Sequence, residues 1–305
     1  MDLTFFLEQI FNGLGYGFML FLLAAGLTLV FGIMDTLNLA HGSLFMAGGY
    51  VSATVHAQSG SFLAAVLVAV LVTVLLAVLL EALLVRRLYG RDHLSQVLAT
   101  FGIVLVADDV VKFLWGPSPI MAPTPALLSG PVQLLGLPYS SYRLLILGAG
   151  LAVAAGLYVL VNHSRLGMLV RAGASNRAMA EFMGVRVSRV FTIVFALGAA
   201  LAALAGALMG PISAVSIGMG EAILIPALVV IVIGGIGSVR GAFVASLLVG
   251  LVDTAGRAFL PPLLREVLAP ALAADVGPAI SSIAMYMLMA GVLVFKPSGL
   301  FPARV

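Results

Sequence analysis

The side chains in this sequence that could carry chemistry lie in short stretches within a strongly apolar background. In the first stretch, residues 35–50, Asn38, His41, Gly42 and Ser43 come close together. Polar side chains inside a membrane are costly against lipid, so they line a polar path or contact another helix. The stretch predicts a path-lining or gating half-helix; the alternative is an interfacial loop among lipid headgroups. A proton relay at His41 is disfavoured, because no second intramembrane ionisable group is placed to accept the proton.

The second stretch is a glycine-rich turn that follows an apolar block. Its sequence over residues 234–241 is Gly-Gly-Ile-Gly-Ser-Val-Arg-Gly, which could be mistaken for a phosphate-binding loop. A Walker-type loop ends in Gly-Lys-Ser/Thr and opens a helix behind a strand, and this turn has neither feature. We therefore expect a short membrane helix that ends in a glycine turn. The candidate path-lining or gating residues of this turn are Gly234, Gly235, Gly237 and Ser238.

The third stretch is a connector, residues 162–189, with five arginines and one glutamate. Ser175 or Asn176 can cap a short helix that ends at a glycine. Three large apolar side chains then fall on one face at helical spacing: Met179, Phe182 and Met183. About two turns of helix are too short to be stable alone in water. The apolar face therefore needs a partner, which is either the headgroup region of the membrane or a cytoplasmic subunit.

The composition excludes several other kinds of chemistry. The 305 residues are 62% apolar and 9% charged, with no cysteine and four histidines. Soluble domains carry roughly 25% charged residues, so this chain lacks the ionic groups for a water-exposed surface. Without cysteine there is no thiol catalysis, thiolate metal site or disulfide. The net charge of +3 is spread over loops and predicts no nucleic-acid binding. We assign no catalytic and no metal-binding residues, and an intramembrane enzyme is disfavoured.

The elements that position these stretches are membrane helices. About twenty helical residues cross the hydrocarbon of a bilayer. Nine apolar segments approach that length: residues 9–33, 37–55, 62–85, 94–115, 142–161, 190–211, 222–236, 241–260 and 278–295. The segments 37–55 and 222–236 are short or broken by glycine. The predicted fold is an all-α polytopic membrane protein with about nine transmembrane or partly spanning helices.

The distribution of positive charge predicts the orientation. With the N-terminus outside and the C-terminus inside, eleven of the fifteen lysines and arginines lie on the cytoplasmic side. The two longest external connections are then residues 116–141, with six prolines, and residues 261–277. Proline at this density predicts a stiff, extended loop for the first of them.

Two groups of charged residues lie towards the outer ends of predicted helices. Asp108 and Asp109 are within helical reach of Lys112, and Asp253 is four residues before Arg257. We expect local pairs that limit the cost of charge there. A coupling-ion site would need carboxylates near the middle of the membrane, whereas these acids lie towards one face of it.

Taken together, the sequence resembles the LivH-type permeases of branched-chain amino acid ABC importers. The resemblance covers nearly the whole chain and rests on four blocks in order: Leu-Asn-Leu-Ala-His-Gly-Ser-Leu-Phe-Met-Ala-Gly-Gly-Tyr at 37–50, Arg-Ala-Gly-Ala-Ser-Asn-Arg-Ala-Met-Ala-Glu-Phe-Met-Gly at 171–184, the turn at 234–242, and Lys-Pro-Ser-Gly-Leu-Phe at 296–301. The acid pair Asp108-Asp109 departs from the expected pattern, in which these positions are uncharged or singly acidic.

The resemblance implies one permease domain over residues 1–305 in the bacterial inner membrane. Such a subunit pairs with a LivM-like permease, two cytoplasmic ATPases and a periplasmic binding protein. This chain would hold no cofactor, because the ATPases bind ATP and Mg²⁺. Residues 162–189 would be the coupling segment, and loops 116–141 and 261–277 would be periplasmic. The implied coupling residues are Ser175, Asn176, Arg177, Met179, Glu181, Phe182 and Met183.

The substrate implied by the resemblance is a branched-chain or related hydrophobic amino acid. Permeases of this type also serve urea, amides and aromatic carboxylates, which remain alternatives. A second class of function is an ion-coupled secondary transporter, with residues 38–43 and 234–238 as the candidate ion site.

Overall fold

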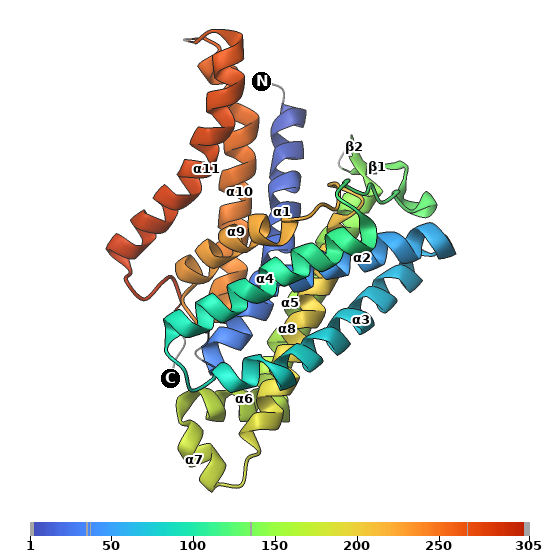
Figure 1. Ribbon diagram of the computed structural model, residues 1–305. Helices are drawn as coiled ribbons and strands as arrows, with labels where there is room; N and C mark the ends of the chain where they lie inside the picture. Colours follow the sequence, from blue (N-terminus) through green and yellow to red (C-terminus); the bar gives the residue numbers. More distant parts are fainter. Residues whose placement is uncertain (1–2, 35, 37, 135, 267, 302–305) are drawn as a thin grey trace.

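The computed structural model describes residues 3–34, 36, 38–134, 136–266 and 268–301, which form a bundle of long helices (Figure 1). The long helices are α1 (Leu3–Met34), α2 (His41–Ser59), α3 (Phe62–Leu83), α4 (His93–Trp115), α5 (Ser141–His163), α8 (Val187–Met209), α9 (Met219–Gly234), α10 (Val239–Leu264) and α11 (Pro270–Phe295). The short elements are η1 (Val85–Leu88), η2 (Ala126–Leu128), α6 (Arg165–Ser175), α7 (Arg177–Phe182), β1 (Pro131–Leu134) and β2 (Leu137–Ser140).

The helices confirm an all-α polytopic membrane protein. Within the described residues, six helices are long and apolar enough to cross a membrane: α1, α3, α5, α8, α10 and α11. Helix α9 is a shorter apolar helix of 16 residues. Each of the nine expected segments coincides with one of the long helices, but a crossing by α2, α4 and α9 stays a prediction.

The two connections expected outside the membrane contain more regular structure than the sequence predicted. The expectation of a long loop at 261–277 is wrong for most of its length, because α10 continues to Leu264 and α11 begins at Pro270. Pro261 packs against Gly277 of α11, so the two helices support each other where proline weakens the backbone ladder. In the other connection, β1 and β2 form an antiparallel hairpin with Val132 opposite Tyr139.

The proline-rich connection 116–141 is tied to the bundle at two points. Ile120 and Val215 exchange backbone hydrogen bonds of 2.9 Å, which joins this connection to the α8–α9 linker. The Tyr139 hydroxyl donates to Asn12 Oδ1 of α1 over 3.2 Å. The hairpin lies at one end of the bundle, and α6 and α7 lie at the other (Figure 1).

The centre of the bundle is formed by α1 and α8. Most of α1 from Phe18 to Met34 is buried, and α1 packs against α5, α8, α9 and α10. The outer helices α3, α4, α5 and α11 instead expose many large apolar side chains, such as Leu75, Phe113 and Phe295. In water this surface would cause aggregation, whereas in lipid it is the ordinary outer surface of a membrane protein.

Small residues allow the central helices to approach each other closely. A β-carbon on Gly48 of α2 would lie 2.5 Å from the Ala203 Cα of α8, and one on Gly206 would overlap the Phe45 carbonyl oxygen. Helices in lipid associate through such packing, because burying apolar surface away from lipid gains little. The small residues of α8, among them Ala203 and Gly206, therefore form a packing surface.

The α2–α8 contact can be tested by adding one methyl group. Gly206→Ala introduces a β-carbon where the Phe45 backbone lies, so we expect destabilisation by about 1–3 kcal/mol. Gly148→Ala in α5 is the matched control, because no atom lies within 4 Å of its β-carbon position. Thermal unfolding of the detergent-purified variants, followed by size exclusion, measures the difference. Equal midpoints for the two variants would contradict the close contact.

Candidate functional site

The polar stretch at the start of α2 is buried inside the bundle. Asn38 is 2% exposed, and its Oδ1 accepts a hydrogen bond of 3.1 Å from the Ala40 amide, which shapes the turn into α2. The Leu39 amide donates to Thr100 Oγ1 of α4 over 3.3 Å. This turn therefore connects the end of α1, the start of α2 and the middle of α4.

His41 fills a notch between the two central helices. Its side chain is 1% exposed, and its Nε2 lies 3.0 Å from the position of a β-carbon on Gly26 of α1. On the other side of the ring, a β-carbon on Gly198 of α8 would lie 3.3 Å from the His41 Cε1. Gly42 contacts the backbone of Gly220 at the start of α9, and Ser43 is also buried. In this chain, residues 38–43 occupy contacts between helices and do not face an open space.

The glycine turn after α9 meets the C-terminal segment. Gly235 and Gly237 have φ values of 100° and 79°, which only glycine adopts readily. The Leu300 amide donates to the Ile233 carbonyl over 2.8 Å, and the Phe301 amide donates to that of Gly234 over 3.0 Å. Two of the four sequence blocks, the turn and residues 296–301, are thus one structural unit. Sequence reasoning missed this pairing.

Ser238 caps the helix that follows the turn. Its Oγ accepts a hydrogen bond of 3.1 Å from the Gly241 amide at the start of α10. Gly237 contacts Gly32 near the end of α1. The turn and residues 38–43 do not meet directly, because Gly42 touches the opposite end of α9, about 21 Å along the helix from Gly234. Both groups contact α1.

The connector contains the expected short helix and one more. Asn176 is the cap of α7, and its Oδ1 accepts a hydrogen bond of 2.9 Å from the Met179 amide. The side chains of Met179, Phe182 and Met183 are 58%, 87% and 78% exposed, so the described residues leave their apolar face uncovered. The side chain of Arg177 lies outside the described part of the structure.

Helix α6, which the sequence did not predict, attaches α7 to the bundle. Ser164 caps it by accepting a hydrogen bond of 3.0 Å from the Gly167 amide, and Ser175 is its last residue. Buried Val170 and Gly173 face the core, where Gly173 approaches Ile33 of α1. The Arg171 guanidinium donates to the Val161 carbonyl. The α6–α7 unit is therefore fixed against the end of α1.

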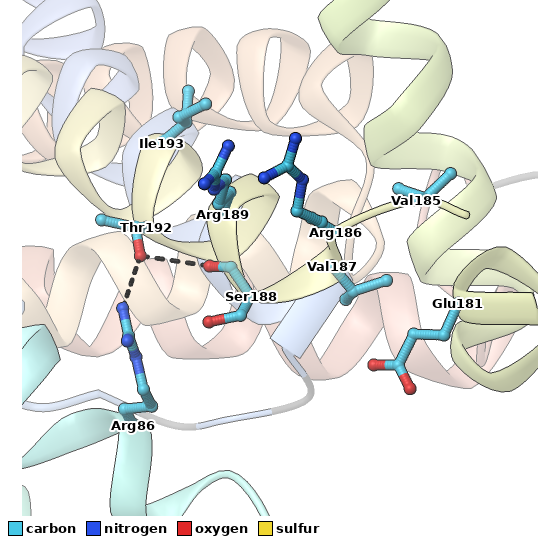
Figure 2. A pocket seen from close by; sticks show the side chains of 9 residues that line it. All are labelled: Arg86, Glu181, Val185, Arg186, Val187, Ser188, Arg189, Thr192 and Ile193. Atoms are coloured by element: carbon cyan, nitrogen blue, oxygen red, sulfur yellow. Dashed lines mark hydrogen bonds between the residues drawn. The ribbon is translucent and has the colours of Figure 1, made fainter.

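A groove of about 700 Å³ opens beside this unit, between the end of α7, the start of α8 and η1 (Figure 2). Its lining residues are Arg86, Glu181, Val185, Arg186, Val187, Ser188, Arg189, Thr192 and Ile193. Glu181, a predicted coupling residue, thus lies at the groove, whereas the apolar face of α7 does not line it.

A buried carboxylate next to the groove joins α3 to α8. Glu81 is fully buried and accepts hydrogen bonds from Arg86 at 3.1 and 2.9 Å, from the Tyr89 hydroxyl at 2.9 Å and from the Thr192 hydroxyl at 3.0 Å. The hydrogen bond to Glu81 raises the pKa of Arg86, which therefore stays charged. The sequence signal for this network was a single acid at the end of an apolar helix, five residues before an arginine.

The outer charges differ in part from the expectation. Asp253 and Arg257 form the predicted i, i+4 ion pair, at 2.8 Å. Within the described residues, no ion pair joins Asp108 or Asp109 to Lys112, so that expectation is wrong. Asp108 instead lies beside Glu221 of α9. The α4–α9 contact places two acids together, which spacing along α4 alone could not reveal.

Comparison with known proteins identifies the family. A family model described as branched-chain amino acid transport system / permease component matches residues 9–294. The chain belongs to this family. It is 29% identical to the high-affinity branched-chain amino acid transport system permease protein BraD of Pseudomonas aeruginosa, over 98% of this chain and 96% of BraD. No solved structure matches the chain.

Two further permeases of the family show how widely the similarity extends. The chain is 27% identical to the corresponding permease protein LivH of Escherichia coli K12, over 88% of this chain and 91% of LivH. It is 25% identical to a probable LivH of Methanocaldococcus jannaschii, over 78% of this chain and 77% of that protein. The polar start of α2, the connector and the glycine turn all lie within the part that matches the permease family.

The Glu81 network can be tested with a double-mutant cycle. Arg86→Ala leaves a buried carboxylate with hydroxyl partners only, so we expect a larger loss of thermal stability than from Glu81→Ala. The double variant should resemble Glu81→Ala, because no buried charge is left unpaired. Arg87→Ala, an exposed neighbour, serves as the control. The midpoints of thermal unfolding in detergent measure the cycle, and additive effects of the two substitutions would contradict this role of Glu81.

Proposed function

We propose that this chain is a permease subunit of an ATP-driven importer for branched-chain or related hydrophobic amino acids. The observation that carries the proposal is the family match over residues 9–294. Relatives named for high-affinity branched-chain amino acid transport match 88–98% of the chain. The mostly apolar bundle, in which at least six of the described helices are long and apolar enough to cross a membrane, suits a subunit that supplies a path through the membrane. In this proposal the chain is not itself an enzyme.

The proposed partners follow from this role. A LivM-like permease would complete the path, two cytoplasmic ATPases would bind ATP and Mg²⁺, and a periplasmic binding protein would deliver the substrate. The ends of the bundle support this arrangement, because the unpartnered face of α7 and the hairpin β1–β2 lie at opposite ends (Figure 1). The hairpin and the short 265–269 connection would then face the periplasm, with the C-terminus in the cytoplasm.

Residues 162–189 would act as the coupling segment. A protein partner explains the exposed apolar face of Met179, Phe182 and Met183, which α6 holds in place at the end of α1. ATP-driven closure of the ATPases would displace α7, and α6 would pass the movement to the bundle. This is a rigid-body route between two arrangements of packed helices.

The residues 38–43 and the turn at 234–238 would gate the path indirectly, because they determine how the helices pack against one another. Asn38, His41, Gly42 and Ser43 are buried, so they set how α1, α2, α8 and α9 meet. Gly234, Gly235, Gly237 and Ser238 fix the far end of α9 against α1 and the C-terminal segment. A small shift of α9 or α1 would alter the shape of the surface that the bundle presents to the second permease.

The coupling role predicts a selective loss of transport. Phe182→Glu places a charge on the apolar face of α7, and we expect ATP-linked uptake to fall roughly tenfold or more, as for a central interface residue. Phe182→Leu keeps an apolar side chain and should retain most uptake. The assay is uptake by the reconstituted importer, with the amount of assembled complex measured in parallel. Normal uptake by the assembled Phe182→Glu complex would disprove the coupling assignment.

The energy source and the substrate can be tested in the same vesicles. We expect leucine, isoleucine or valine to be transported only with ATP, and the isolated chain neither to bind nor to hydrolyse ATP. Urea and aromatic carboxylates are the alternative substrates, and the cognate binding protein should rank them by affinity. Uptake that follows an ion gradient and survives ATP depletion would refute an ATP-driven importer.

A further inference from the structure

The groove beside the start of α8 carries charge for which the described residues provide no partner. Arg186 and Arg189 line it and are exposed, and within the described residues no hydrogen bond or ion pair involves either guanidinium. The third arginine, Arg86, already binds Glu81 and Thr192. Figure 2 shows the Arg186 and Arg189 side chains pointing in the same direction. Two free guanidiniums three residues apart form a site for an anion.

The backbone of α8 adds to this positive potential. Helix α8 is 23 residues long, begins at Val187 and has no acidic residue in its first turn. No side chain caps its N-terminus. The first amides of a helix lack partners within the helix, and its dipole is positive at this end. The amides of Val187 and Arg189 already donate to the carbonyls of Val185 and Arg186. The groove thus combines the two guanidiniums with the positive end of the helix dipole.

The face of α8 that carries Arg189 continues into an apolar environment. Arg189 and Ile193 are four residues apart and share one face of α8, and Arg186 directly precedes the helix. Ile193 is 45% exposed and lies about 9 Å along the axis from Val187. Because α8 is long and apolar enough to cross a membrane, this face runs from the headgroup region into the hydrocarbon.

We propose that this groove binds an anionic phospholipid, such as phosphatidylglycerol. The guanidiniums of Arg186 and Arg189 would donate hydrogen bonds to the phosphate oxygens, and an acyl chain would lie along Ile193. A soluble ATPase subunit could offer a carboxylate to the arginines, but it could not contact Ile193 within the hydrocarbon. An anionic phospholipid places a phosphate at the depth of the arginines and an acyl chain at the depth of Ile193. Basic pockets between helices at a membrane surface bind such headgroups.

The test compares two charge-matched variants of the full chain. Arg186→Gln/Arg189→Gln removes the two unpaired arginine charges of the groove and leaves Arg86 and Glu181 in place, and Arg87→Gln/Arg91→Gln removes two exposed charges outside it. The purified proteins are mixed with dodecyl maltoside micelles that contain either phosphatidylglycerol or phosphatidylcholine. Native mass spectrometry counts the bound lipids. Size exclusion confirms that both variants remain folded.

We expect the unmodified chain to prefer phosphatidylglycerol, and the groove variant to lose roughly tenfold in affinity for it. The control variant should change by less than about twofold. Equal losses in both variants would overturn the proposal, because they would reflect total charge and no specific site. The absence of any preference over phosphatidylcholine would overturn it as well.

Two further arms separate the other possible occupants. Soluble glycerol phosphate should compete poorly with phosphatidylglycerol; equal competition would show a site for free anions and overturn the lipid proposal. In the assembled importer, a photo-crosslinking residue at position 189 should capture lipid. Exclusive capture of the ATPase subunit there would also overturn it. These results are independent of uptake, so they distinguish this proposal from the proposed transport function.

Discussion

Close backbone contact at small residues holds α1 against α8 and α10, and the remaining helices are placed around this centre. Helices in lipid gain little by burying apolar surface, so their association depends on how closely their atoms pack. Gly26 meets Gly198 between α1 and α8, and Gly250 meets Gly13 and Gly17 between α10 and α1. A side chain at these positions would push two backbones apart, and every helix that packs on α1 would move with it.

Polar side chains occur in this bundle where the close contacts leave room for them. His41 fits because Gly26 and Gly198 present no side chains. Glu81 fits because one arginine and two hydroxyl groups satisfy its oxygens. A buried carboxylate without partners would be strongly unfavourable, so the network requires the end of α3, η1 and α8 to keep a fixed arrangement. The proposed coupling segment therefore meets a rigid part of the bundle.

The sequence was most informative where one rule decided the outcome. Apolar length located all nine long helices, and the cap Asn176 with its apolar residues located α7. The errors arose where tertiary contacts prevailed. The sequence analysis expected a long external connection at 261–277, but α10 continues to Leu264, α11 begins at Pro270, and the two helices support each other there. The contacts of Glu81 with Thr192 and of residues 300–301 with the glycine turn join segments far apart in sequence, and no local pattern encodes such pairing.

The arrangement also constrains how the proposed importer could work. Residues 38–43 and the turn at 234–238 lie at opposite ends of α9, so no single side chain can sense both. Helix α1 contacts both groups, through Gly26 and Gly32, and its end contacts α6 through Ile33. A displacement that enters at α7 therefore reaches either group by way of α6 and α1. Because α1 is packed without gaps at its glycine contacts, it would transmit such a displacement as a rigid body rather than absorb it.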